Sequence, residues 1–286
     1  MLTVRQIDGV VAAALDEDAP WGDLTSESLI PADATARALL VAREGGVLSG
    51  IDLFAAAFRL TDPRITVETH AQDGDMFGEG AQLATVTGPA RGILTAERVG
   101  LNLTQRMTGI ATLTNRYVRA VVDTRARIAD TRKTTPGLRA LERHAVRSGG
   151  GSNHRFSLSD AVMAKDNHLA LLMRGAEGSL TDALRNVRAR LPHTAHLEVE
   201  VDRVDQIEAV VAAGVDTIML DNFSVDDLRT GVAIVDGRAV VEASGGVSLD
   251  TVGDIARTGV DVISVGALTH SARALDLGLD IDAVPR

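Results

Sequence analysis

The pattern of apolar and polar positions changes near the middle of the chain. In the first third, short apolar segments separated by Gly and Asp turns predict strands over 34–42, 64–70 and 81–87, with a helix near 50–60. A long stretch with helical periodicity, 93–122, follows and is predicted to link two domains.

Beyond this stretch, aliphatic segments alternate with amphipathic ones. The predicted strands cover 127–131, 162–164, 196–201, 217–220, 239–243 and 261–265, and the predicted helices lie near 137–147, 179–191, 203–213, 225–235 and 249–258. Such alternation indicates right-handed crossovers and a parallel sheet. Six strands are too few for an eightfold barrel, so the pattern leaves an incomplete barrel and an open doubly wound sheet as the options.

Polar residues follow each predicted strand of this second part. They are TRK at 131–133, KDNH at 165–168, Glu198 and Glu200 with Asp202, DN at 221–222, SGG at 244–246 and GA at 266–267. Parallel α/β folds bind ligands at the carboxyl ends of their strands. Six consecutive strands that end in this way predict a ligand site rather than solvated loops.

The distribution of charge along the chain indicates which chemical class of ligand the site binds. The chain has a net charge of −10, and only two of its 29 basic residues are lysines, Lys133 and Lys165. Both fall in residues 125–165, where nine basic residues face three acids. An acidic chain is a poor partner for nucleic acid, so this stretch favours a polyanionic small molecule, with a solvated basic helix face as the alternative.

Other features of the sequence argue against disulfide, thiolate and membrane proteins. The absence of cysteine rules out disulfides and thiolate chemistry, and aromatic residues make up only 2% of the chain. An aliphatic core suits a parallel sheet covered by helices. No apolar segment is long enough to span a membrane and the N-terminus does not resemble a signal peptide. We therefore expect a cytoplasmic enzyme with no membrane partner.

Two glycine segments are candidates for phosphate binding. Ser244, Gly245 and Gly246 follow one strand, and Val265, Gly266 and Ala267 follow the next. Glycine lets backbone N–H groups approach a phosphate closely, and a following helix would add its positive dipole end.

Acidic and basic candidates surround this position. Glu200 and Asp221 end neighbouring strands and suit Mg²⁺, although ion pairs with arginines are the alternative, and Glu198 is a weaker candidate. The predicted carboxylate-binding cations are Arg132, Lys133, Arg155 and Lys165, with His154 beside them. No pair of nucleophile and base stands out. The residues therefore favour a transfer reaction that depends on positioning and electrostatics.

The combined motifs resemble one family. TRKTTPGLRALERHAVRSGGGSNHRFSLSDAVMAKDNH, EVEVD, LDNFS, EASGGVS and DVISVGALTHSARALDLGLDI are similar to quinolinate phosphoribosyltransferases, and the likeness extends over about 18–281. It implies conversion of quinolinate and 5-phosphoribosyl-1-pyrophosphate into nicotinate mononucleotide, pyrophosphate and CO₂ with Mg²⁺, in NAD biosynthesis. It also implies an N-terminal α/β sandwich over 1–105, with the tail 272–286 packed on it. An incomplete TIM-like barrel of six or seven parallel strands would occupy 106–271.

The resemblance also assigns roles to residues. Arg132, His154, Arg155 and Lys165 would hold the quinolinate carboxylates, and Arg98 would reach the same site from the other subunit of a homodimer, or within a hexamer. Lys133 would lie near the pyrophosphate, and Thr131 would also bind substrate, while Glu200 and Asp221 would serve Mg²⁺ and the ribose hydroxyls. Ser244, Gly245, Gly246, Val265, Gly266 and Ala267 would bind the 5-phosphate. Lys133, Lys165, Glu200 and Asp221 are the predicted catalytic residues.

Three alternatives remain open from the sequence. One is a related paralogue of the molybdate-transport loci that does not use quinolinate. Another is a phosphate-binding barrel isomerase or lyase, which would account for the glycine segments but not for the cations. The third is a paralogue that binds ligands without catalysis.

Overall fold

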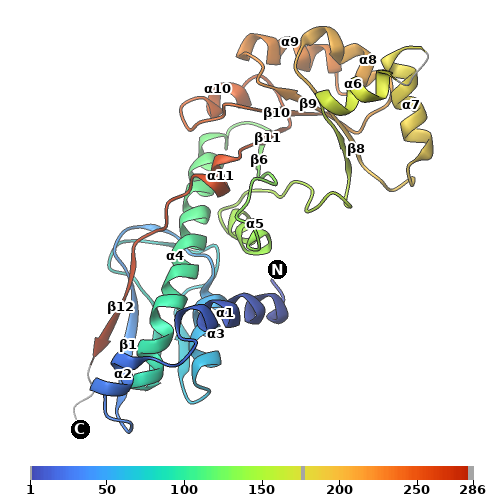
Figure 1. Cartoon of the computed structure of the whole chain (residues 1–286). Coiled ribbons are helices and arrows are strands. Elements are labelled where there is room, and N and C mark those ends of the chain that lie inside the picture. Colours follow the sequence, from blue (N-terminus) through green and yellow to red (C-terminus); the bar gives the residue numbers. More distant parts are fainter. Residues whose placement is uncertain (1, 175–177, 283–286) are drawn as a thin grey trace. The chain divides into compact units, whose positions relative to one another are not determined.

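The computed structural model describes residues 2–174 and 178–282 and forms two compact units (Figure 1). The first unit comprises Met1–Asn115, Thr134–Gly150 and Leu268–Arg286, and the second comprises Arg116–Lys133 and Gly151–Ala267. Residues 1 and 283–286 of the predicted N-terminal domain and its tail lie outside the described residues.

The first unit contains a four-stranded antiparallel sheet in the order β12-β1-β5-β3. Its strands are β1 (Thr35–Ala42), β3 (Thr66–Thr69), β5 (Gln82–Pro89) and β12 (Leu277–Asp282), and a separate pair is formed by β2 (Gly46–Val47) and β4 (Met76–Phe77). Alternate residues of β1 are buried, as expected for a strand with one face on a core. The last strand, β12, pairs with β1 from Arg37 to Ala42, so the end of the described chain completes this sheet.

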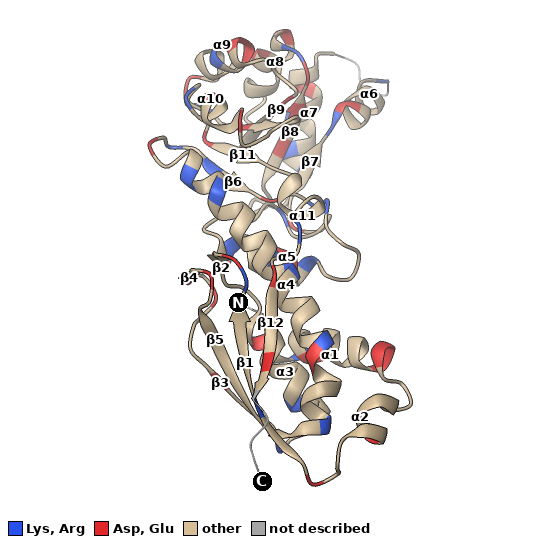
Figure 2. Cartoon of the chain, turned by 90° about the vertical axis from the view of Figure 1, so that its left-hand side faces the viewer, with Lys and Arg blue, Asp and Glu red and all other residues tan. Residues whose placement is uncertain are grey.

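Helices α1 (Val4–Asp18), α3 (Ile51–Thr61) and α4 (Ala90–Ala120), most of which belongs to this unit, lie beside the sheet, as Figure 2 shows. The unit also contains α2 (Leu24–Leu29) and α5 (Arg139–Ser148). Thr3 and Gln6 form a capping box that begins α1, which the sequence analysis did not predict as a helix. Phe54 and Phe58 of α3 are fully buried, with ring centroids 4.8 Å apart, and supply rare aromatic volume to an aliphatic core.

The second unit is built on a six-stranded parallel sheet in the order β6-β11-β10-β9-β8-β7. Its strands are β6 (Arg127–Ala129), β7 (Val162–Ala164), β8 (Leu197–Val201), β9 (Thr217–Asp221), β10 (Val240–Ser244) and β11 (Val262–Ser264). From β7 to β11 each strand neighbours the next, and β6 then pairs with β11. A doubly wound sheet would reverse this order at a switch point. The predicted incomplete barrel is therefore confirmed, with β6 and β7 at its open edges.

Helices follow the strands of this unit as the alternation predicted, with differences at the ends. They are α6 (Asp166–Arg174), α7 (Leu180–Arg190), η1 (Val204–Gln206) with α8 (Ile207–Val211), α9 (Val225–Val235) and α10 (Val252–Ala256), and α11 (Ala267–His270) begins at the last residue of the unit. Helix α6 was not predicted. Basic and acidic residues are interspersed along the chain (Figure 2), and none of the helices among the described residues could span a bilayer.

Strand β8 illustrates how the sheet directs side chains. Leu197, Val199 and Val201 alternate with Glu198 and Glu200. Successive side chains of a strand point to opposite faces, so the three apolar residues share one face and the two acids share the other. Glu198 is only 3% exposed, which places a carboxylate inside the unit at the middle of the strand.

Candidate active site

Residues from the ends of all six parallel strands line one cavity of about 370 Å³. This volume is in the range of small-molecule sites. The lining residues are Thr131, Arg132, Lys133, His154, Arg155, Met163, Lys165, Glu200, Met219, Asp221, Ser244 and Ser264. The structure therefore brings together nine of the residues predicted from the sequence, and it adds Met163, Met219 and Ser264. We call this space the cation cavity.

Two guanidinium groups, those of Arg132 and Arg155, line the same part of the cation cavity. The side chains of Arg132 and Arg155 lie close enough to repel each other: burial lowers the pKa of Arg155, and the charge of Arg132 lowers it further. The Nε atom of Arg132 is buried and has no hydrogen-bond partner among the described residues. A buried donor beside a like charge costs free energy in the absence of a ligand. This part of the cavity is consequently built for an anion.

The cation cavity is also lined by acids. Lys165 Nζ donates to Glu200 Oε2 at 2.7 Å, and Asp221 Oδ2 accepts from Asn222 Nδ2 at 2.7 Å. Glu200 is the residue before the end of β8, Asp221 is the last residue of the paired strand β9, and both are half-buried. Two hard carboxylates that face one cavity fit the ligand preference of Mg²⁺, which keeps waters and substrate oxygens as its other ligands.

The glycine segment after β10 has a conformation that only glycine tolerates well. Gly245 and Gly246 have φ angles of +88° and +60°, and a Cβ atom on Gly245 would clash with the side chain of Asn222. The predicted contribution of a helix dipole is not supported, because the helices that follow are short: α10 has 5 residues and α11 has 4. Backbone N–H groups are left as the anion-binding element of these turns.

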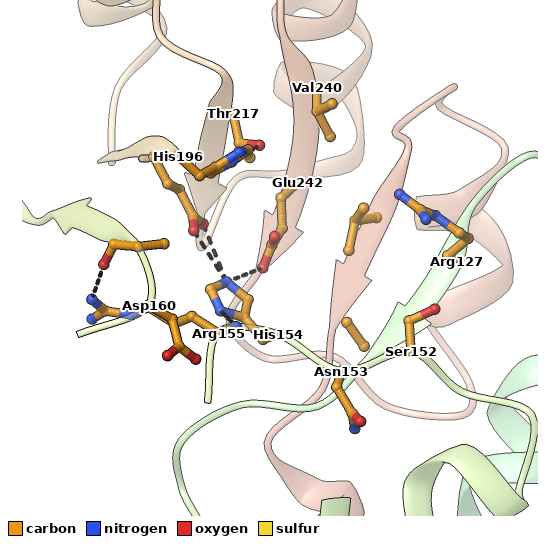
Figure 3. A pocket seen from close by; sticks show the side chains of 14 residues that line it. Arg127, Ser152, Asn153, His154, Arg155, Asp160, His196, Thr217, Val240 and Glu242 are labelled. Atoms are coloured by element: carbon orange, nitrogen blue, oxygen red, sulfur yellow. Dashed lines mark hydrogen bonds and ion pairs between the residues drawn. The ribbon is translucent and has the colours of Figure 1, made fainter. Parts of the chain in front are cut away.

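His154 is anchored from two directions. Its backbone N–H donates to Asp130 Oδ1 at 2.7 Å, and its ring Nε2 lies 3.2 Å from Glu198 Oε2 and 3.5 Å from Glu242 Oε1. Figure 3 shows the ring directed toward Glu242. Burial lowers the pKa of His154, but the hydrogen bond to Glu198 and the nearby negative charges outweigh it, so the pKa is raised. Burial, and then the charge of Glu198, raises the pKa of Glu242 to about 7.

The remaining predicted residues do not line the cavity. Gly245 and Gly246 follow Ser244, while Val265 is buried and its N–H donates to Ala129 O at 2.9 Å. Gly266 and Ala267 follow it directly, and Arg98 is an exposed residue of α4 in the first unit. Glu242, which contacts His154, is not among the predicted residues. An acid within the apolar segment VVEAS was the available signal.

A parallel α/β unit whose strand ends carry clustered cations, paired acids and glycine turns has the features of an enzyme that acts on anionic small molecules. Two family models match the chain: the N-terminal domain of quinolinate phosphoribosyl transferase over residues 23–108 and its C-terminal domain over residues 110–280. The chain belongs to the quinolinate phosphoribosyl transferase family.

Individual relatives agree with this assignment. The chain is 46% identical over 280 residues to the nicotinate-nucleotide pyrophosphorylase [carboxylating] of Mycobacterium leprae, with 95% of each chain covered. It is 43% identical over 265 residues to the probable enzyme of the same name from Bacillus subtilis, covering 93% of this chain and 90% of the relative. The crystal structure of NadC from Streptococcus pyogenes superposes with a TM-score of 0.94 at 40% identity, over 100% of this chain and 99% of the other.

Proposed function

We propose that this chain transfers the phosphoribosyl group of 5-phosphoribosyl-1-pyrophosphate to quinolinate with decarboxylation. The products are nicotinate mononucleotide, pyrophosphate and CO₂, and the reaction is a step of NAD biosynthesis. The names of the relatives and of the matching family models support this activity. The observation that carries the proposal is that the guanidinium groups of Arg132 and Arg155 line the same cation cavity, because quinolinate is a dicarboxylate.

The basic residues divide into two groups in this proposal. Arg132 and Arg155, with His154 and Lys165, bind the two carboxylates of quinolinate, since a guanidinium fork matches a carboxylate in geometry. Lys133, which is exposed at the rim, lies with Thr131 where the pyrophosphate binds. A mobile ammonium suits a leaving group that changes position during the reaction.

The acids and the glycine turns bind the phosphoribosyl part. Glu200 and Asp221 bind Mg²⁺ and the ribose hydroxyls, and the ion would supply charge neutralisation for the pyrophosphate. The 5-phosphate binds to Ser244, Gly245 and Gly246 and to the turn formed by Val265, Gly266 and Ala267, through backbone N–H groups. The unusual φ angles of Gly245 and Gly246 support this role.

The site then acts mainly by positioning and electrostatics. As the bond between ribose C1 and pyrophosphate breaks, positive charge develops on the ribose, and Lys133 stabilises the negative leaving group. The pyridine nitrogen forms the new bond to C1 and becomes a pyridinium. Loss of CO₂ from C2 leaves an electron pair next to this positive nitrogen, and the pair takes up a proton. The arginines hold the ring during both steps.

The proposed assembly is a homodimer, or a hexamer, in which Arg98 of the partner subunit completes the quinolinate site. The exposure of Arg98 on α4 is compatible with this role. A cytoplasmic location stays a prediction from the sequence.

The test is a steady-state assay that measures nicotinate mononucleotide and CO₂ together, with quinolinate, 5-phosphoribosyl-1-pyrophosphate and Mg²⁺. We expect the two products in equal amounts and loss of both when the metal is chelated, with recovery on adding Mg²⁺. Lys165→Ala should reduce turnover strongly, while the control Arg229→Met, which changes an exposed residue of α9, should not. Binding of quinolinate without turnover, or indifference to the phosphoribosyl donor, would contradict the proposal.

A further inference from the structure

A buried cluster of His154, Glu198 and Glu242 lies beside the cation cavity. One ligand atom from each residue falls within 4.8 Å of the other two. Glu198 and Glu242 are 3% and 4% exposed, and they come from β8 and β10, which flank β9 in the sheet. Buried carboxylates at the middle of barrel strands destabilise a fold unless they are paired, so their presence indicates a role that apolar residues could not fill.

The imidazole separates two cavities of the second unit. His154 and Arg155 line the cation cavity at the carboxyl ends of the strands, and both also line a second cavity of about 410 Å³. The second cavity includes residues that begin the strands, such as Arg127, Thr217 and Val240, and it includes Glu198 and Glu242 (Figure 3). The two acids therefore contact His154 from the side that faces away from the cation cavity.

The same histidine is fixed along its backbone. Its N–H donates to the fully buried Asp130, whose other carboxylate oxygen accepts from Asn153 Nδ2 at 2.6 Å. The backbone N–H of Arg155 donates to the ring Nδ1 at 2.7 Å. With Nε2 at the two glutamates, both ring nitrogens have partners, and rotation of the ring requires several of these interactions to break. Side chains locked in this way by surrounding hydrogen bonds are typical of precise binding sites.

We propose that Glu198 and Glu242 are positioning residues for quinolinate binding: through Nε2 they hold the His154 imidazole in the wall of the cation cavity. This inference rests on the proposed function. Neither acid lines the cation cavity, so they act through the histidine and not on the substrate. The pyridine dicarboxylate then meets a ring edge whose orientation is already fixed, and Arg155, the next residue, is fixed with it.

The test compares truncation with conservative replacement. We expect Glu198→Ala to lower kcat/KM for quinolinate by roughly 100-fold, the loss typical of a small misplacement in a site, and Glu198→Gln to restore most of it because the amide oxygen still accepts from Nε2. The KM for 5-phosphoribosyl-1-pyrophosphate should change by no more than about twofold. Glu208→Gln, which removes an exposed acid of α8, is the matched control and should leave both constants unchanged.

A double-mutant cycle tests whether the glutamates act through His154. In the His154→Ala background, Glu198→Ala and Glu242→Ala should have no further effect on quinolinate kinetics, whereas equal losses in both backgrounds would overturn the proposal. An equal loss of kcat/KM for both substrates, together with a lowered Tm, would show that the glutamates have only a structural role and would also overturn the proposal.

An NMR measurement distinguishes failure of the positioning role from failure of the proposed function. The ¹⁵N chemical shift of His154 Nε2 should change on adding quinolinate but not on adding 5-phosphoribosyl-1-pyrophosphate alone, and it should change in Glu242→Gln without any ligand. If quinolinate does not bind at all, the proposed function fails, while the shift in Glu242→Gln still reports whether the acids hold the ring. Stoichiometric Zn²⁺ binding that is lost in both Gln variants would show that the cluster is a metal site and would refute the positioning role.

Discussion

Replacing Arg132 by methionine removes one guanidinium from the cation cavity and keeps a side chain of similar length. Truncating one partner of a desolvated charge pair costs about 2–5 kcal/mol. Arg132 is half-buried, so the lower part of this range, about 2–3 kcal/mol, applies. At about 1.4 kcal/mol for each factor of ten, kcat/KM for quinolinate should fall roughly 30- to 150-fold.

The same change should not destabilise the fold. The charge of Arg132 lowers the pKa of Arg155, which means that the two guanidinium groups repel each other in the absence of substrate. Removing one of them relieves this repulsion, and it also removes the buried Nε that has no hydrogen-bond partner among the described residues. The Tm of Arg132→Met should therefore equal or exceed that of the unmodified protein, as is common for residues that serve function at the expense of stability.

The assay varies quinolinate at saturating 5-phosphoribosyl-1-pyrophosphate and follows nicotinate mononucleotide, with thermal unfolding measured on the same samples. Arg132→Lys is a second variant, which keeps the positive charge but loses the planar guanidinium. Its activity should lie between that of the unmodified protein and that of Arg132→Met. Arg229→Met again serves as the control for loss of an exposed arginine. Activity of Arg132→Met within about threefold of the unmodified protein would refute the reasoning, and so would a Tm reduced by several degrees.

Three further outcomes follow from other parts of the molecule. Folding raises the pKa values of His154 and Glu242, that of Glu242 from 4.5 to about 7, so the folded state binds more protons than the unfolded state. The free energy of unfolding should therefore fall as the pH rises from about 4.5 through 7, and it should fall less in Glu242→Gln. Urea unfolding at several pH values measures this difference. Glu142, 1% exposed, accepts from Arg106 Nη2 at 2.8 Å, so Glu142→Gln should lower the free energy of unfolding by about 3 kcal/mol in urea titrations. Gly245→Ala, at φ +88°, should raise the KM for 5-phosphoribosyl-1-pyrophosphate at least tenfold and change that for quinolinate little, a contrast that steady-state kinetics measures directly.

The sequence predicted the barrel strands well because each is a short aliphatic run bounded by polar residues. It did not distinguish an incomplete barrel from an open sheet, since that choice depends on the pairing of β6 with β11, which begins at Val262. Strand β12 escaped prediction for a similar reason: LGLDID contains glycine and two acids, and it becomes a strand through its pairing with the distant β1.

The part of the candidate site that could be predicted is the part that follows from the parallel arrangement of the strands. Parallel strands place their carboxyl ends at one edge, so polar residues after six strands had to converge, and nine of the predicted residues line the cation cavity. The cluster around His154 was less accessible. Glu242 is one acid within an apolar strand, and its direction depends on register, while its partners come from β8 and from the loop before β7. Only the folded chain brings these three residues together.

Lys165 and Glu200 connect the two halves of the proposed site. They bond at 2.7 Å, so each is fully available to a substrate only when the other has gained a new partner. A substrate carboxylate that binds Lys165 weakens the bond between Lys165 and Glu200, and Glu200 can then bind a cation or ribose hydroxyls. Binding of quinolinate should therefore increase the affinity for 5-phosphoribosyl-1-pyrophosphate with Mg²⁺, and by reciprocity the reverse should hold by the same factor. Because the pair is partly exposed, this coupling should be modest, about 1 kcal/mol or some fivefold in Kd. Calorimetric titration of each ligand in the presence of a non-reacting analogue of the other measures it, and independence of the two affinities would show that Lys165 and Glu200 act separately.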